Sequence, residues 1–99
     1  IPISDNVLEY AVSLATRTRP NTPRATEAVN NYISWGAGPR ASQYLVLGAK
    51  VHAAINGKYS PDIEDVQAIA NYVLRHRIVR NYKAEAEGIS VEDIINTLL

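Results

Sequence analysis

Apolar residues recur at helical spacing in four stretches of the chain, and each stretch predicts one amphipathic helix. The first helix is expected from about Ser4 to Thr18, and Pro20 follows to stop it. Its apolar stripe consists of Val7, Leu8, Ala11, Leu14 and Ala15. The second helix is expected from Pro39 to Asn56. Its predicted buried face consists of Ala41, Tyr44, Leu45, Gly48, Val51, His52 and Ile55.

The third and fourth helices are predicted mainly from the residues at their N-terminal ends. Ser60 can cap the third helix, Pro61 suits its first position, and acids favour the positive end of the helix dipole. This helix should end near Arg75–Arg77. A capping-box spacing opens the last helix, which is expected from Ser90 to Leu98. The acids in the first turn of the third helix are Asp62, Glu64 and Asp65.

The stretches between these helices show no sustained helical period. Residues 20–38 are therefore expected to form a long loop before the second helix, with a short extended piece over residues 30–35. A second short strand fits residues 78–82, and residues 85–88 read as a polar connection. The predicted fold class is all-α, a small four-helix bundle with at most one very short pair of strands.

Composition narrows the class of protein. The chain has 99 residues, 46% hydrophobic and 20% charged, which is typical of one globular domain. Its net charge is zero, so the molecule as a whole has little attraction for nucleic acid or for anionic membranes. No run of residues is apolar enough to span a bilayer. Without cysteine the chain fits a reducing compartment, and without methionine, even at position 1, it is expected to be part of a longer protein.

The segment from Trp35 to Ser42 carries the most distinctive local signals. Its two glycines permit backbone approaches that a Cβ would block, and Pro39 suits the first turn of a helix. Arg40 would then lie in that first turn, where the helix dipole normally favours an acid. A fixed cation beside exposed N–H groups suits an incoming anion, usually a phosphate. On the residues alone, an exposed arginine with no binding role explains this position equally well.

Three segments together indicate a family. They are Gly36–Ala41 (GAGPRA), Gly57–Val66 (GKYSPDIEDV) and Val73–Ile78 (VLRHRI), and they stand in an order and at separations that resemble the C-terminal helical lid of MoxR-type AAA+ ATPases. That family usually has serine at the position of Gly38, and the proline–acid–valine signature can be aligned here in two ways. Neither departure affects Pro39 or Arg40.

The resemblance implies a role for each part of the segment. Residues 1–99 would be the lid subdomain, without the nucleotide-binding core. Arg40 would be the second-sensor arginine, which reaches across a cleft to the nucleotide phosphates. The neighbouring Gly36, Ala37, Gly38 and Pro39 would lie near the nucleotide. Tyr32 and Trp35 could either belong to the core or touch the adenine.

The resemblance also implies which parts of an ATPase must come from outside this chain. It has no phosphate-binding loop and no strand ending in paired acids for Mg²⁺, so the chain alone has no catalytic residues and should not hold a nucleotide. ATP and Mg²⁺ would be bound by the parent protein, a cytoplasmic ATP hydrolase. Its partners would be its own AAA+ core, neighbouring subunits of a homo-oligomeric ring and a client complex whose maturation it assists.

The alternative is a stand-alone helical module that binds DNA or another protein. Zero net charge and the acids opening the third helix argue against docking in a DNA groove. Two histidines without cysteine do not predict a metal site. The arginines at 75, 77 and 80 could face the core, a neighbour or solvent, or simply oppose the dipole at a helix end. A phosphate-binding loop upstream in the parent reading frame would decide for the ATPase.

Overall fold

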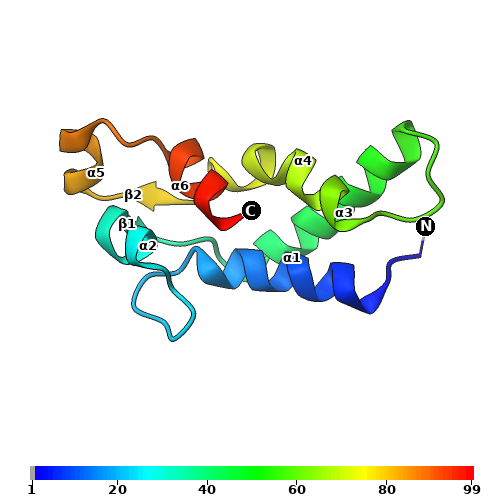
Figure 1. The fold of residues 1–99 in the computed structure, drawn as a ribbon, viewed down its shortest axis with the longest axis horizontal. Coiled ribbons are helices and arrows are strands. Elements are labelled where there is room, and N and C mark those ends of the chain that lie inside the picture. The colour runs from blue at the N-terminus through cyan, green and yellow to red at the C-terminus, as the bar shows by residue number, and fades with distance from the viewer. Residues whose placement is uncertain (1) are drawn as a thin grey trace.

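The structure is a computed structural model that describes residues 2–99, and in this range it is mostly helical with one tiny antiparallel sheet (Figure 1). The predicted all-α class is thereby confirmed. The domain is elongated, measuring 43 × 25 × 19 Å. Its elements are α1 (Asp5–Arg17), α2 (Glu27–Tyr32), β1 (Ile33–Trp35), α3 (Ala41–Ile55), α4 (Ile63–Leu74), β2 (Val79–Arg80), α5 (Tyr82–Glu87) and α6 (Val91–Leu98).

Two helices were not expected. Residues 20–38 are not one long loop, because α2 lies within them, whereas β1 falls in the extended piece expected over residues 30–35. Of the stretch expected as a polar connection, residues 85–87 belong to α5. Both extra helices have six residues, too few to display an amphipathic period, and each is stabilised by a cap. Thr26 accepts a hydrogen bond from the Val29 N–H, and Asn81 accepts one from the Ala84 N–H.

The helix starts also differ from the prediction. α3 begins at Ala41, so Pro39 precedes the helix and Arg40 is its N-cap residue. α4 begins at Ile63 with Asp62 as its N-cap, so neither Ser60 nor Pro61 has the predicted role. Asp62, and not Ser60, is the N-cap because the Asp62 backbone N–H donates to the Asp65 carboxylate at 2.7 Å. This bond is the reverse half of a capping box.

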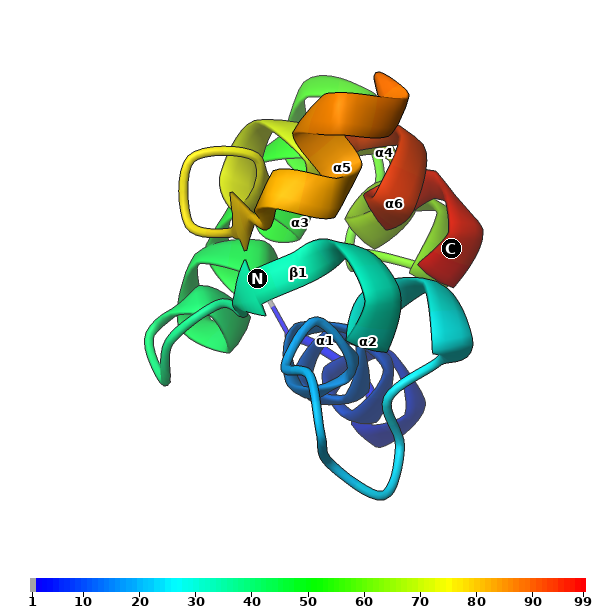
Figure 2. The ribbon, with the colours of Figure 1, turned by 90° about the vertical axis from the view of Figure 1, so that its left-hand side faces the viewer.

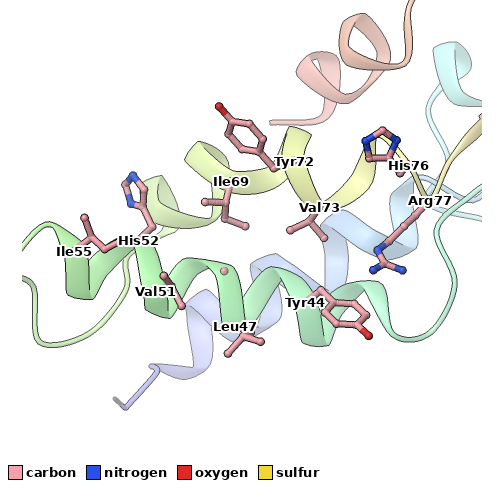
Figure 3. A pocket seen from close by; sticks show the side chains of 11 residues that line it. Tyr44, Leu47, Val51, His52, Ile55, Ile69, Tyr72, Val73, His76 and Arg77 are labelled. Carbon is pink, nitrogen blue, oxygen red and sulfur yellow. The ribbon is translucent and has the colours of Figure 1, made fainter.

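The predicted buried face of α3 is correct only in part, since Ala41 and Leu45 are buried as expected but most of the other predicted residues are not. The buried residues of α3 are Ala41, Leu45, Ala49 and Ala53, spaced four apart, whereas Tyr44, Val51 and Ile55 lie on the outside (Figure 3). Small side chains allow α3 to approach its neighbours closely, and α3 packs most extensively on α4. In α1 the predicted stripe is buried except for Leu8.

The two short strands tie the two halves of the chain together. β1 and β2 pair antiparallel, with Ile33 opposite Arg80 and a register irregularity before Trp35. The Asn81 side chain donates to the Asn31 carbonyl at 2.6 Å, and its N–H donates to the Tyr32 carbonyl. Viewed along the long axis, α2 and β1 lie across the end of α1 (Figure 2). The predicted short strand pair is confirmed.

The segment between β1 and α3 is fixed on the C-terminal end of α1. Thr18, which is fully buried, accepts a hydrogen bond from the Ala37 N–H at 2.9 Å. Arg19 donates through Nε to the Ala37 carbonyl at 2.8 Å. Gly36 passes so close to this turn that a Cβ at position 36 would lie 2.6 Å from the Arg19 Cα and from the Thr18 carbonyl oxygen. Only glycine fits there.

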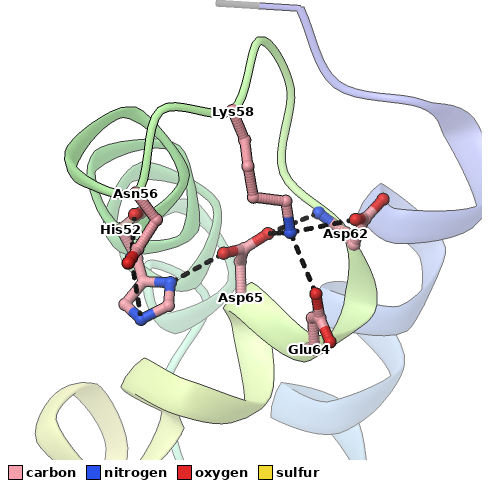
Figure 4. Close-up of polar contacts among 6 residues, drawn as sticks. All are labelled: His52, Asn56, Lys58, Asp62, Glu64 and Asp65. Atoms are coloured by element: carbon pink, nitrogen blue, oxygen red, sulfur yellow. Dashed lines mark hydrogen bonds and ion pairs between the residues drawn. The ribbon is translucent and has the colours of Figure 1, made fainter.

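A buried carboxylate joins the C-terminal end of α3 to the start of α4 (Figure 4). The Asp65 side chain is 1% exposed and contacts His52 Nδ1 at 2.6 Å and Lys58 Nζ at 2.7 Å. Because a carboxylate can only accept hydrogen bonds, the proton of the His52 contact lies on Nδ1. Lys58 also contacts Asp62 and Glu64, at 2.9 and 3.1 Å. We call His52, Lys58, Asp62 and Asp65 the α3–α4 clamp.

The clamp changes the proton affinity of its members. Burial alone would raise the pKa of Asp65, but the Asp62 N–H, the Lys58 ammonium and the His52 imidazole lower it from 3.8 to about 2. The Asp65 and Asp62 carboxylates raise the pKa of Lys58 above its ordinary value. The charged forms of Asp65 and Lys58 are therefore the ones that stabilise the fold near neutral pH.

We expect Gly36→Ala to destabilise the domain by about 1–3 kcal/mol, because the new Cβ must displace backbone rather than a flexible side chain. The midpoint of thermal unfolding, followed by circular dichroism, should fall by roughly 5 °C or more. Gly38→Ala is the matched control, since a Cβ there meets nothing within 4 Å. Equal midpoints for the two variants would contradict the close approach.

We expect the free energy of unfolding to depend on Asp65 ionisation. Its pKa is lowered in the folded state, so its contribution of roughly 2 kcal/mol is present above pH 4 and lost as pH falls towards 2. Asp65→Asn should lower stability at pH 7 by roughly that amount, and urea unfolding should show the difference from the unchanged chain shrinking below pH 4. Glu64→Gln, which alters an exposed acid on the same lysine, should change little. A pH-independent loss would argue against the ionised clamp.

Candidate functional site

Arg40 lies at the start of α3 with its side chain in solvent. Among the described residues it has no hydrogen-bond or ion-pair partner within the distances that define such contacts. Its backbone is nonetheless well held, because the Tyr44 N–H donates to the Arg40 carbonyl at 3.2 Å and begins the α3 ladder. The structure therefore presents a guanidinium with free donors on a rigid base.

The four residues before Arg40 make a short bridge from β1. Ala37 is buried and doubly hydrogen-bonded to the end of α1, whereas Gly38 and Pro39 are exposed. The Gly38 carbonyl accepts the Ala41 N–H at 3.1 Å. The predicted nucleotide-proximal residues are thus a bridge on one side of Arg40, and the backbone N–H and carbonyl of Ala37 are both used to hold it on α1.

The start of α3 is electrostatically unlike those of the other helices that the structure describes. It has neither an acid in its first turn nor a side-chain cap. Each of the others has an acid in its first turn, and α2, α5 and α6 also have a side-chain cap. The first-turn N–H groups of α3 and the Arg40 guanidinium together favour a negative charge. An anionic oxygen with several lone pairs, as in a phosphate, matches such donors.

The two aromatic residues near the bridge have different environments. Trp35 is 73% exposed and so is not a core residue. It lines a hollow of about 340 Å³ with the Arg19 turn. Tyr32 packs against the core, and its hydroxyl donates to the Glu87 carboxylate at 2.9 Å, which raises the pKa of Tyr32.

The sequence did not reveal a groove between α3 and α4 (Figure 3). Its volume is about 740 Å³. Its α3 wall includes Tyr44, Val51 and Ile55, which were expected in the core, together with Leu47, which was not. Gly48 forms part of its floor, where Ile69 comes close to the α3 backbone. The other apolar lining residues are Tyr72 and Val73.

The three C-terminal arginines have separate environments. Arg80 donates to the Ile89 carbonyl at 2.7 Å and so serves the fold of this domain. Arg75 and Arg77 are exposed, and their guanidinium groups lie over the rings of Tyr72 and Tyr44 at 5.5 and 4.3 Å. Arg77 lines the groove. These two cations are therefore available to a partner.

Within residues 2–99, no three histidine, cysteine or acidic side chains are grouped so that they could hold a metal ion. No helix within that range has both the length and the apolar character needed to cross a membrane.

Known proteins resemble this chain over most of its length. "Chaperone MoxR1" of Mycobacterium tuberculosis is 33% identical over 93 residues, and "Uncharacterized protein YeaC" of Bacillus subtilis is 26% identical over 95 residues. These alignments cover 94% and 96% of this chain but only 25% and 27% of the relatives. The chain thus spans about a quarter of these proteins.

A solved structure and a family comparison agree with these relatives. The crystal structure of a "putative ATPase" from Cytophaga hutchinsonii matches 99% of this chain and 30% of its own, with a TM-score of 0.91 and 39% identity. Residues 25–98 match the AAA lid domain family. The resemblance to the lid of MoxR-type AAA+ ATPases is confirmed, and the chain belongs to the AAA lid domain family.

Proposed function

We propose that this chain is the lid that closes over the nucleotide in a MoxR-like AAA+ ATPase, and that Arg40 senses the nucleotide phosphates. The observation that carries this proposal is the placement of Arg40: an exposed guanidinium without a partner in its own domain, at the uncapped start of a long helix. An arginine that only faces solvent does not need a backbone fixed by neighbouring elements. The bridge fixed on α1 and the fifteen-residue helix behind Arg40 give it a defined position.

The chemistry of arginine suits this role. Its guanidinium stays charged at every relevant pH and offers planar, paired donors to phosphate oxygens. In a closed cleft from which water is excluded, such a charge-assisted bond is stronger than at an open surface. Movement of the lid would add Arg40 to the nucleotide site or withdraw it, and so couple domain position to the state of the nucleotide.

ATP and Mg²⁺ fit this chain only as part of a larger site. Arg40 and the first-turn N–H groups of α3 could meet phosphate oxygens, but the described residues include no cluster of acids able to hold the metal. The bound nucleotide supplies the bond that is hydrolysed. What this chain contributes is charge at the phosphates and closure of the cleft against water.

The partners follow from the same proposal. The chain would dock on its own nucleotide-binding core and adjoin neighbouring subunits of a homo-oligomeric ring. The name of the relative MoxR1 describes a chaperone, and we extend to the parent of this chain a chaperone-like role in maturing client complexes in the cytoplasm. Hydrolysis by the core would drive the lid movement that acts on the client.

In the parent protein, we expect Arg40→Ala to lower the rate of ATP hydrolysis by roughly 10- to 100-fold. The loss corresponds to one charge-assisted bond of about 1.5–3 kcal/mol that is made in the transition state. Arg40→Lys should restore little, because a single ammonium does not reproduce the planar fork. Steady-state phosphate release measures the effect. Arg24→Ala, at an exposed arginine away from α3, is the control. Unchanged turnover in Arg40→Ala would refute the sensing role.

The 99-residue chain by itself should neither hydrolyse ATP nor bind it measurably. One exposed arginine contributes only about 0–1 kcal/mol to binding a phosphate in open water. Titration calorimetry with ATP should therefore show no saturable heat at micromolar concentrations. A micromolar dissociation constant for the isolated chain would mean that the nucleotide site does not need the core.

A further inference from the structure

The end of α1 holds both backbone polar groups of one buried residue of the bridge, Ala37. Thr18 is fully buried, and its hydroxyl donates to the Ala15 carbonyl at 2.7 Å while it accepts from the Ala37 N–H at 2.9 Å. Arg19 Nε donates to the Ala37 carbonyl at 2.8 Å. Two consecutive side chains are thus used to fix a single peptide segment that lies 18 and 19 positions further along the chain.

The start of α3 has no such support from its own residues. Its N-cap residue, Arg40, makes no capping hydrogen bond with its side chain, whereas α2, α5 and α6 each begin with a side-chain cap. The Ala41 N–H donates to the Gly38 carbonyl at 3.1 Å, but the Ser42 and Gln43 N–H groups have no acceptor among residues 2–99. Because a cap normally stabilises the first turn, this turn of α3 depends on neighbouring contacts.

Only a short piece of backbone separates the fixed peptide from the guanidinium. Gly38 and Pro39 stand between Ala37 and Arg40, so the distance that the chain can span there is at most roughly 11 Å. The ring of Pro39 fixes its φ angle, and the first turn of α3 uses the Gly38 carbonyl. Core packing holds the body of α3 from Ala41 onward. The bridge therefore sets the backbone of the residue just before that packing begins.

We propose that Thr18 and Arg19 are positioning residues for the phosphate sensor: they hold Ala37 and so give the start of α3 the support that other helices receive from a side-chain cap. A cap within α3 would occupy first-turn N–H groups. Support from α1 leaves those groups free for an anion beside the Arg40 guanidinium. This inference rests on the proposed function, because it takes Arg40 to meet a phosphate. It goes further in naming the residues that place Arg40.

The test is a double-mutant cycle on ATP hydrolysis by the full-length parent protein. Thr18→Val preserves the shape of the side chain but removes the hydroxyl. It should lower kcat by about three- to tenfold, because even a small misplacement of a charged group at the reacting phosphate is costly. When Arg40→Ala is already present, Thr18→Val should change kcat by less than about twofold, since a residue that acts through Arg40 then has nothing to position.

Three further variants separate positioning from a general loss of stability. Thr18→Ser retains the hydroxyl and should retain most of the activity. Thr26→Val is the matched control, because it removes another threonine hydroxyl that accepts a backbone N–H, that of Val29 at 3.2 Å, away from the bridge. Arg19→Ala removes the second bond to Ala37 from a half-buried side chain, and it carries the same test if Thr18→Val does not fold.

The expected result is a loss of turnover in Thr18→Val and Arg19→Ala that requires Arg40, with Thr26→Val unaffected. A loss of equal size with and without Arg40, or a comparable loss in Thr26→Val, would overturn the positioning role. Full turnover in both bridge variants, with Arg40→Ala impaired, would overturn it as well and would leave the sensing role standing. Unchanged turnover in Arg40→Ala would refute the sensing role, and the positioning role with it.

Discussion

The pairing of α3 with α4 depends on one buried negative charge. Asp65 lies where the two helices meet, and an uncompensated carboxylate at such a place would be strongly unfavourable. Lys58 from the connecting turn and His52 from α3 both contact the Asp65 carboxylate. A different path of the turn would therefore remove Lys58 and leave the buried carboxylate without its ammonium partner. The clamp thereby fixes the direction in which α3 runs. Both the position of Arg40 and the shape of the groove depend on that direction.

The long elements of the fold could be predicted from the sequence because their spacing is local information. Spacing did not reveal which face of α3 is buried, since this helix carries two apolar stripes. One consists mainly of alanines and the other of bulky residues such as Val51 and Ile55. A scale of hydrophobicity favours the bulky stripe, but the residues that the core buries are mainly the small ones. The short helices α2 and α5 were not predicted because six residues are too few to show the helical repeat of apolar positions.

The candidate site was predictable where it is contiguous in sequence. Arg40 and its preceding bridge are adjacent residues, so a local pattern could single them out. The clamp and the groove bring together residues that are distant along the chain, and their single members have ordinary explanations. Asp65 reads as a helix-dipole partner, and nothing local indicates that it is buried. The sequence marks Gly36 as unusual, but it does not indicate that Gly36 packs on the turn at Thr18 and Arg19.

The hydrogen bonds at the end of α1 have a mechanical consequence. Thr18 holds the bridge that leads to Arg40, and Arg17 donates through Nη1 to the Leu98 carbonyl at 3.0 Å, so the first helix is joined to both the middle and the last turn of the domain. The chain that leads to Arg40 is thus tied back to the end of α1 at Ala37. A displacement of α1 would therefore carry the base of the guanidinium with it through these two hydrogen bonds.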